Sequence, residues 1–399
     1  MANFLFIVQG EGKGHLTQAI SLAEILHNSG HKVVATMVGT AYERKIPAFY
    51  TDSITAPLYQ FESPSLHYGK GKAPNIAATV IGHGMKANKY IANANLVHEI
   101  VERHQPDAII NFYELAAAIY NFKFKPKIPT ICIGHQYLLQ NKHFQSIKNK
   151  KIDQWMLNLN TTLTGYGSTK KLALSFTPMP NDDEKNIVVV PPLLRNLVKK
   201  GETHTGDYIL AYVTHYKIAE DIMAWQAQNK HIRVECFIDK KKVNDGFEIQ
   251  ENMYIHKVNA EHFLDKMKNC MGLVSTAGFE SVCEAMYLGK PVLMVPVKNH
   301  IEQRINAHDG ERAGAGIYSK KFKIEKLINY IPNYKNTSTD FRTWEKDANR
   351  LFLNHIEEVI FDKVYQNATN NKPKISTWTK IKKWSNGVID KNWGQLLPS

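Results

Sequence analysis

The sequence predicts an α/β protein made of two doubly wound, Rossmann-like domains, each built on a parallel sheet. Three observations predict this fold. Short apolar runs alternate with helical segments, an order typical of parallel sheets covered by helices. The chain has 399 residues, which is long for a single core. Two adjacent prolines, Pro191 and Pro192, interrupt the pattern before it restarts, and we expect a hinge over 190–196.

The elements follow one another in a regular order. In the first half, we expect the strands FLFIV, KVVATMV, DAIINF and PTICIGH, with one helix from about Leu16 to Asn28 and another that ends near His104. After IVVVPPLLR, the second half supplies the strands DYILAYVTHY, RVECFID, MYIHKV, MGLVSTAG and PVLMVPV. We therefore expect a first domain at 1–190, a second at 191–360 and a basic tail at 361–399.

Composition narrows the class of protein. The 4 cysteines form no CxxC pair, which argues against a zinc site or a disulfide framework and suits a reducing compartment. No apolar run approaches the roughly 20 residues that span a bilayer, and the apolar N-terminal stretch is too short for a signal peptide, so we expect a cytoplasmic protein. A net charge of +13 indicates anionic partners, which include nucleotides, nucleic acid and acidic lipids.

The loop GEGKGH, from Gly10 to His15, follows the first predicted strand. It resembles the dinucleotide fingerprint GxGxxG, but the third glycine is replaced by His15. The strand KVVATMVGT also ends without the acid that binds a ribose, so a nicotinamide or flavin site is not expected. Gly12 and Gly14 instead let an acceptor approach, and a neutral His15 can take its proton. Helix capping or phosphate binding by His15 are the alternatives.

A strand and the helix after it, within residues 271–307, predict a diphosphate site. We expect the strand to end at Val274 and the helix to run from about Gly278 to Leu288. Backbone amides at a helix N-terminus favour an anion, and hydroxyl groups in the turn add donors. The hydroxyl residues of this turn are Ser275 and Thr276.

Carboxylates and an amide extend this predicted site. Glu284 lies farther along the helix, where its carboxylate can accept hydrogen bonds from both ribose hydroxyls. Glu302 and Gln303, in the HIEQ segment, are adjacent polar groups able to bind sugar hydroxyls. The alternative is structural: Ser281-Val-Cys-Glu284 fits the capping box Ser-x-x-Glu, in which Glu284 would bond to the start of the helix.

The two segments together resemble the GT-B glycosyltransferases, in the inverting branch that contains the plant and macrolide UDP-sugar transferases and the bacterial N-acetylglucosaminyltransferase of peptidoglycan synthesis. QGEGKGHLTQA is similar to the family's N-terminal glycine loop, which implies that His15 is the base or an acceptor contact. TAGFESVCE is similar to the donor motif, which implies phosphate contacts near Thr276 and Gly278 and ribose binding by Glu284. EQRINA resembles the sugar-binding end of that motif, which implies contacts from Glu302 and Gln303.

The donor motif departs from the family pattern at three positions. The phosphate-binding histidine of the plant branch is Thr276 here, and the large aromatic residue and asparagine after the glycine are Phe279 and Glu280. Retaining enzymes of the fold usually carry a glutamate eight residues before the ribose glutamate. That position is again Thr276, which favours inversion.

The expected partner of the base departs from the pattern as well. The family's aspartate after the PD-apolar strand corresponds to Asn111 in PDAIINFYE. Either Glu114 supplies the charge, or His15 acts without a carboxylate partner. The same resemblance implies weaker assignments, which are otherwise ordinary linker or turn residues: Arg195 and Thr214 on the donor phosphates, and His135 and Gln136 on the acceptor.

Lysines and aromatic residues gather in two segments. Residues 120–151 hold seven lysines and no acidic residue, and the tail carries the segment KPKISTWTKIKKWSNG. This mixture suits an anionic membrane surface, although a solvated face of a basic protein explains either segment alone. No nucleic-acid-binding motif accompanies the charge, so nucleic acid is not expected. The aromatic residues concerned are Phe122, Phe124, Tyr137, Phe144, Trp378 and Trp384.

These patterns predict a metal-independent, cofactor-independent inverting glycosyltransferase. We expect it to move a hexose or N-acetylhexosamine from a nucleotide-diphosphate sugar, with uridine as the expected nucleoside, to an acceptor hydroxyl. A lipid-linked acceptor at the inner face of the membrane and a soluble small molecule are both open. The alternatives are a sugar-nucleotide epimerase and a nucleotide-sugar-binding protein without catalysis.

Overall fold

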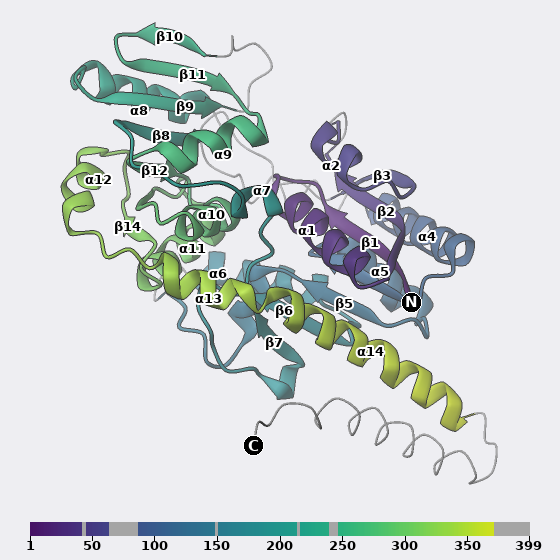
Figure 1. The fold of residues 1–399 in the computed structure, drawn as a ribbon. Coiled ribbons are helices and arrows are strands. Elements are labelled where there is room, and N and C mark those ends of the chain that lie inside the picture. The colour runs from purple at the N-terminus through teal and green to yellow at the C-terminus, as the bar shows by residue number, and fades with distance from the viewer. Residues whose placement is uncertain (42–44, 64–86, 148–150, 214–215, 239–245, 371–399) are drawn as a thin grey trace, which may run out of the picture. The chain divides into compact units, whose positions relative to one another are not determined.

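The computed structural model describes residues 1–41, 45–63, 87–147, 151–213, 216–238 and 246–370. The chain divides into a large unit, 1–354, and a small unit, 355–399. Two seven-stranded sheets organise the large unit (Figure 1), one from each half of the sequence. The predicted α/β class with two doubly wound sheets is confirmed.

The first sheet is wholly parallel and has the strand order β3-β2-β1-β4-β5-β6-β7. The order reverses direction at β1, and ligands of open parallel sheets bind outside the carboxyl ends of the strands at such a point. Its strands are β1 (Asn3–Gln9), β2 (Lys32–Thr40), β3 (Leu58–Glu62), β4 (Ala108–Phe112), β5 (Thr130–Ile133), β6 (Lys170–Leu174) and β7 (Ile187–Val190).

Helices of the first half bury their apolar residues against this sheet. Leu5 and Ile7 of β1 and Ile109 of β4 share one core with Val97 and Tyr120 from two of these helices. Described helices of this half are α1 (Gly14–Asn28), α2 (Ala48–Ser53), α4 (Ala87–His104), α5 (Leu115–Phe124), the 3-10 helix η1 (His135–Gln140), α6 (Lys151–Thr164) and the 3-10 helix η2 (Asp183–Lys185).

The second sheet has the order β10-β11-β9-β8-β12-β13-β14. Its pairs are parallel except at one edge, where β10 runs antiparallel to β11. Its strands are β8 (Tyr208–Val213), β9 (Arg233–Ile238), β10 (Phe247–Gln250), β11 (Met253–Lys257), β12 (Gly272–Ser275), β13 (Val292–Met294) and β14 (Gly316–Tyr318).

The helices of the second half cover this sheet and extend the described chain to Asn370. Ile218 and Ile222 of α8 pack on Val234 and Val274 of the strands. These helices are α7 (Asn196–Lys199), α8 (Tyr216–Ala227), α9 (Ala260–Asn269), α10 (Phe279–Tyr287), α11 (Ile301–Arg312), α12 (Glu325–Tyr330), the 3-10 helix η3 (Ile331–Asn333), α13 (Ser338–Lys346) and α14 (Ala348–Asn370).

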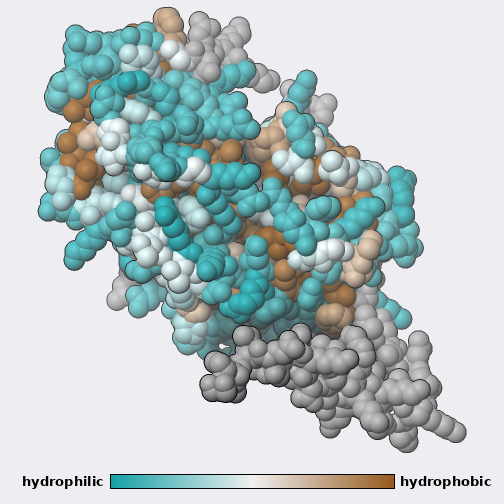
Figure 2. All heavy atoms as spheres, viewed as in Figure 1, coloured by the Kyte–Doolittle hydropathy of each residue, from teal (hydrophilic) through white to brown (hydrophobic). Residues whose placement is uncertain are grey.

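Hydrophilic side chains cover most of the face drawn in Figure 2, and apolar side chains gather there in separate areas. In the parts of the chain that the structure describes, no helix combines the length and the apolar character needed to cross a bilayer.

Candidate active site

Each glycine of the first loop has a structural reason at its own position. A Cβ at Gly10 would lie 2.6 Å from Thr40 Cγ2, because Gly10 packs against the end of β2. Gly12 has a φ of +90°, which side chains with a Cβ rarely adopt. A Cβ at Gly14 would lie 3.3 Å from Glu280 Cγ. The loop is therefore a tight turn that brings the start of α1 close to α10 of the second half.

His15 is the second residue of α1 and is partly buried. Its ring stacks on Tyr113, with the ring centroids 5.9 Å apart, and its Nδ1 lies 3.1 Å from Gln18 Oε1. Burial lowers the pKa of His15 to about 4, so the imidazole is neutral at pH 7. The helix-capping alternative for His15 is wrong, because Lys13 occupies the N-cap and no side chain caps this helix.

Asn111 and Glu114 hold the turn between β4 and α5. The amide of Asn111 is fully buried, donates to Thr164 O at 3.2 Å, and accepts from Glu114 N at 2.8 Å. Glu114 is the N-cap of α5, where its carboxylate accepts from Ala116 N at 3.3 Å and from Ser63 Oγ at 2.7 Å. Burial raises the pKa of Glu114 to about 7. Among the described contacts it is Gln18, rather than either of these residues, that bonds to His15.

The turn between β12 and α10 forms the corresponding feature of the second half. Ala277 adopts a left-handed conformation with a φ of +61°, and Asn306 Nδ2 donates to its carbonyl at 3.3 Å. Gly278 is the N-cap of α10 and, having no side chain, makes no side-chain cap hydrogen bond to the first amides of this helix. A helix N-terminus without a side-chain cap favours an anion, since its first N–H groups have no partner inside the helix.

The hydroxyl groups of this turn are buried. Ser275 Oγ and Ser281 Oγ lie 3.1 Å apart, and Ser281 Oγ donates to Gly278 O at 3.1 Å. Thr276 lies between them in the chain and is buried as well. The capping-box alternative is wrong, because α10 begins at Phe279 and Ser281 is therefore its third residue rather than its N-cap.

Two residues expected on the donor contact each other. Arg195, which precedes α7, donates from Nη2 to Glu284 Oε1 at 2.6 Å, and both side chains are largely buried. Arg195 Nε is also buried and has no hydrogen-bond partner within the described residues. The other expected phosphate contact, Thr214, lies outside the described residues.

Residues expected on the acceptor and on the sugar also meet. Gln136 Nε2 of η1 donates to Glu302 Oε1 of α11 at 3.0 Å, and burial raises the pKa of Glu302. The His135 ring stacks on Phe279, the first residue of α10, with a centroid distance of 4.1 Å. Burial lowers the pKa of His135. The first turns of α10 and α11 thus contact the segment that follows β5.

Gln303 is oriented by the backbone before α11. Its Oε1 accepts from Val297 N at 2.9 Å, and its own N–H lies 3.4 Å from Nδ1 of His300, the N-cap of α11. Burial lowers the pKa of His300 to about 4. His300 was not among the predicted site residues, although a histidine directly before a predicted helix is a position from which a side chain can cap.

Gln18 and Tyr113, which contact His15, were not among the predicted site residues either. Gln18 lies three residues after His15, a spacing that places both side chains on one face of a helix. Tyr113 follows directly after β4, at the edge where ligands of a parallel sheet bind. Both signals are present in the sequence, and neither distinguishes a site residue from a packing residue.

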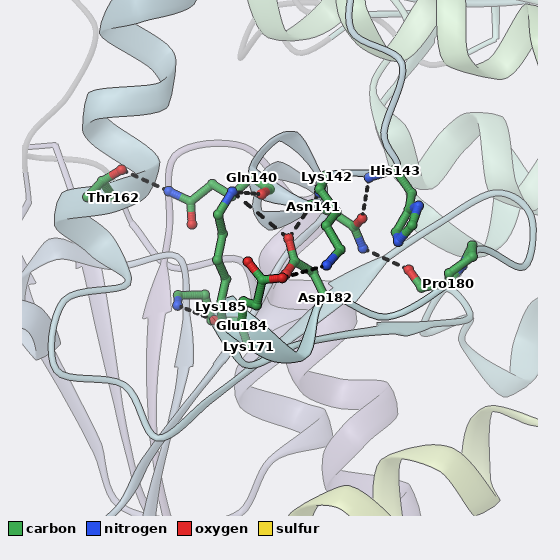
Figure 3. Close-up of polar contacts among 10 residues, drawn as sticks. All are labelled: Gln140, Asn141, Lys142, His143, Thr162, Lys171, Pro180, Asp182, Glu184 and Lys185. Carbon is green, nitrogen blue, oxygen red and sulfur yellow. Dashed lines mark hydrogen bonds and ion pairs between the residues drawn. The ribbon is translucent and has the colours of Figure 1, made fainter.

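Figure 3 shows how the basic segment 120–151 meets an acidic turn. Lys142 Nζ donates to Glu184 Oε1 at 2.9 Å, and this contact raises the pKa of Lys142. The backbone N–H of Lys142 donates to Asp182 Oδ2 at 3.0 Å. Part of the positive charge of this segment is therefore compensated within the protein.

Other residues of the two basic, aromatic segments differ in exposure. Tyr137 is fully buried, so the expectation that it contributes to a surface is wrong. Phe124 and Phe144 are partly buried, whereas Phe122 is 65% exposed. Residues 148–150 and the tail with Trp378 and Trp384 lie outside the described residues.

The described residues hold no cluster of metal-ligating side chains. No group of three or more His, Cys, Asp or Glu side chains there has the arrangement that could hold an ion. Metal independence stays a prediction.

The comparisons with known proteins agree on the fold. The sequence model of the family described as Glycosyl transferase family 1 matches residues 2–333. No curated protein matches the sequence. The glycotransferase of kitacinnamycin has a similar structure, with a TM-score of 0.61 at 14% identity over 90% of this chain and 99% of that chain.

Two further solved structures are similar. The calicheamicin glycosyltransferase CalG4 gives a TM-score of 0.55 at 13% identity, over 90% of this chain and 98% of that chain. UGT2 of Phytolacca americana, in complex with UDP-2fluoro-glucose and pterostilbene, gives 0.57 at 14% identity, over 88% and 95%. At such identities the likeness shows the fold, and the GT-B fold expected from the sequence is confirmed.

Proposed function

The chain belongs to glycosyl transferase family 1, and from this membership we propose that it transfers a hexose or N-acetylhexosamine from a nucleotide-diphosphate sugar to an acceptor hydroxyl. We propose further that the donor is a uridine nucleotide and that the anomeric carbon inverts. One juxtaposition carries the proposal: the neutral His15 of the first half is linked through Gln18 to Glu280, in the first turn of α10. A candidate base and an anion-favouring helix end thus belong to one site.

The donor diphosphate is proposed to bind at the N-terminus of α10. Gly278 leaves the first amides without a side-chain cap, and Thr276, Ser275 and Ser281 surround the turn. A buried hydrogen-bond donor without a partner costs about 1–3 kcal/mol. Arg195 Nε is such a group among the described residues, so a phosphate oxygen of the nucleotide sugar that accepts its hydrogen bond would remove this cost.

The ribose and the sugar follow from this placement. Arg195 holds one oxygen of Glu284, and the second oxygen makes no hydrogen bond within the described residues, which supports ribose binding there. Glu302 and Gln303 are proposed to bind the sugar hydroxyls. Gln136, whose Oε1 is buried without a partner among the described residues, is proposed to bind the sugar or the acceptor beside Glu302.

The proposed reaction is an in-line displacement. Nε2 of His15 takes the proton of the acceptor hydroxyl while that oxygen forms a bond to the anomeric carbon. The bond from the anomeric carbon to the diphosphate oxygen breaks, and its electron pair leaves with the nucleoside diphosphate. The α10 amides and Arg195 stabilise the charge that develops on the leaving group, a role that a metal ion fills in other enzymes.

We propose that the protein binds an anionic membrane surface and takes its acceptor from there. One side of α6 exposes an apolar stripe formed by Trp155, Leu159 and Leu163, whose spacing of four residues places them on one helix face. Tyr166, in the turn after α6, is exposed as well. Phe122, at the end of α5, contacts Tyr166 edge-to-face at 5.8 Å. Lys123 and Lys125 follow Phe122 in the chain, and the net charge is +13, which complements acidic lipid headgroups.

Vesicle binding tests this surface. We expect cosedimentation with vesicles that contain phosphatidylserine and weak binding to pure phosphatidylcholine, with loss of binding in a Trp155→Ala, Leu163→Ala double variant. Phe247→Ala removes another exposed aromatic side chain, on β10, and serves as the matched control. Absence of binding to anionic vesicles at moderate salt would remove the membrane proposal and leave a soluble acceptor.

A thermal-shift panel of nucleotide sugars tests the proposed function itself. We expect the melting temperature to rise with a uridine diphosphate sugar and the rise to disappear in Glu284→Ala. If no uridine, guanosine or thymidine donor shifts the melting temperature, the transferase proposal fails. Incubation with the donor alone separates the remaining candidates: an epimer identifies an epimerase, and binding with neither an epimer nor transfer to any acceptor identifies a binding protein.

A further inference from the structure

Three side chains from the two halves form one hydrogen-bonded chain. His15 Nδ1 lies 3.1 Å from Gln18 Oε1, and Gln18 Nε2 donates to Glu280 Oε1 at 2.5 Å. His15 and Gln18 lie one turn apart on α1, and Glu280 is in the first turn of α10. The glycine at position 14 lets α1 and Glu280 approach, since a Cβ there would lie 3.3 Å from Glu280 Cγ.

The direction of the Gln18 amide decides which nitrogen of His15 carries the proton. A side-chain amide has a donor end and an acceptor end, and the oxygen Oε1 of Glu280 accepts from the donor end. The carbonyl of Gln18 therefore faces His15, and a carbonyl can only accept. With the amide in this orientation, Nδ1 of His15 carries the hydrogen, which leaves the lone pair on Nε2.

We propose that Glu280 is a positioning residue for the transfer reaction: through Gln18 it holds His15 as the Nδ1–H tautomer, with Nε2 available to the acceptor hydroxyl. This inference rests on the proposed function only in taking His15 as the base. The resemblance to the inverting transferases implies an aspartate in this role, and the corresponding residue, Asn111, is engaged in the β4–α5 turn. The partner comes instead from the half of the chain that is proposed to bind the donor.

The hydrogen-bonded chain from His15 to Glu280 connects the proposed acceptor site with the proposed donor site. Glu280 is in the first turn of the helix proposed to hold the diphosphate, whereas His15 is at the start of the helix proposed to face the acceptor. Gln18 is buried, with an exposed fraction of 3%. Contact between the N-terminus of α10 and α1 therefore fixes the orientation of the Gln18 amide, which couples donor-site geometry to the tautomer of the base.

The surroundings keep Glu280 compatible with a bound diphosphate. Burial raises the pKa of Glu280 to about 8, to which the charge of Glu284 also contributes, while Gln18 and Arg195 act in the opposite direction. At pH 7 the protonated carboxyl places no negative charge at the helix end, and its carbonyl oxygen still accepts from Gln18. The charge of Glu280 also acts on the Cys283 thiol of α10, and Tyr113 stacks on His15.

Nitrogen-15 NMR of histidine-labelled protein tests the link without any enzymatic assay. Ring nitrogen shifts distinguish the two tautomers, and His15→Gln assigns the signal. We expect the Nδ1–H tautomer in the wild type and in Glu280→Gln, which keeps an accepting oxygen, and a mixture of tautomers in Glu280→Ala. An Nε2–H tautomer in the wild type, or an unchanged tautomer in Glu280→Ala, would overturn the proposal.

Kinetics adds the link to the reaction. In Glu280→Ala we expect kcat to fall by roughly 10-fold or more, the scale on which groups that orient a histidine act, with the acceptor KM nearly unchanged and Glu280→Gln retaining most of the activity. Equal kcat in the wild type and Glu280→Ala would overturn the catalytic part. If the tautomer shifts but no donor supports transfer by the wild type, the link stands and the proposed function fails.

A paired exchange sharpens the test. Gln18→Glu combined with Glu280→Gln swaps amide and carboxylate, so that a carboxylate contacts Nδ1 directly and raises the pKa of His15. We expect the acidic limb of the pH profile to move to higher pH in this double variant, and Gln18→Glu alone to be less active because it places two carboxyl groups together. Glu345→Gln, which removes a buried carboxylate paired with Lys199 instead, is the control and should leave tautomer and kcat unchanged.

Discussion

The starts of α1 and α10 are built alike and offer different chemistry. Each follows a central strand of its own sheet, β1 and β12, through a short turn that contains left-handed backbone, at Gly12 and Ala277. Neither helix has a side-chain cap. At α1 the proposed site residue is a side chain, the neutral His15, whereas at α10 it is the set of backbone amides after Gly278. The same local architecture therefore carries the proposed base in one half and the proposed anion site in the other.

The largest effect that this comparison predicts is that of His15→Ala. General bases contribute about 10²–10⁴-fold to a rate, and we expect kcat to fall by that factor while the thermal shift with donor persists. The measurement is the initial rate of transfer together with the donor-induced change in melting temperature. An unchanged rate of transfer in His15→Ala would show that the start of α1 does not supply the base, and the proposed difference between the two helix starts would be wrong.

Arg195→Ala should give the opposite pattern at the α10 end. The substitution removes a proposed phosphate contact and leaves the buried carboxylate of Glu284 without its partner. We expect the dissociation constant of the donor, measured by titration calorimetry, to rise about 10–100-fold, on the basis of about 1.5–3 kcal/mol for a hydrogen bond to a charged group. If Arg195→Ala keeps its affinity for the donor but loses transfer, the proposal that the α10 end binds the donor and the α1 end supplies the base is wrong.

Two alanine substitutions separate fold from site within the first loop. Gly10→Ala places a Cβ 2.7 Å from the carbonyl oxygen of Gly39, so we expect a loss of roughly 1–3 kcal/mol of unfolding free energy. Gly14→Ala meets only the Glu280 side chain at 3.3 Å and should cost less stability, but it should lower kcat by displacing Glu280. Denaturant unfolding and kinetics of both variants test this, and equal stabilities would contradict the packing of Gly10 on β2.

The smallest expected effect is a pH dependence of stability. The pKa of Glu280 is raised from 4.5 to about 8 in the folded protein, so the folded state holds this proton more tightly than the unfolded state. Its contribution to stability is complete below about pH 4.5 and falls as the pH rises toward 8. Around pH 8 we expect Glu280→Gln to melt at a higher temperature than the wild type, and the difference to shrink near pH 5. A constant difference would contradict ionisation of Glu280.

Periodicity in the sequence was sufficient to predict the sheets because their central strands are continuous apolar runs. The edge strands β3 and β10 were not predicted because neither is a continuous apolar run: β10 is largely exposed, and β3 mixes exposed, partly buried and buried residues. Short strands such as β14 carry too few residues for any pattern. Strand pairing, not composition, makes these segments strands.

The site was predictable to the extent that it is local. His15 and the α10 turn each follow a strand within a few residues, so spacing places both at the carboxyl ends of strands. The contact between Gln18 and Glu280 joins residues 262 positions apart, and no local pattern contains it. For Asn111 and Glu114 the sequence predicted the positions but not the contacts. Their hydrogen bonds within the β4–α5 turn are visible only in three dimensions.

The left-handed backbone of Ala277 has a consequence for any attempt to engineer this protein. A residue with a Cβ pays about 1–2 kcal/mol in that conformation, and glycine does not. A screen for heat resistance would therefore favour Ala277→Gly. The same exchange widens the range of directions in which the next amides can point, so a screen for turnover would reject it. If the first screen selects Ala277→Gly and the second rejects it, the difference in unfolding free energy between the two forms is the stability cost of holding the proposed anion site in one conformation.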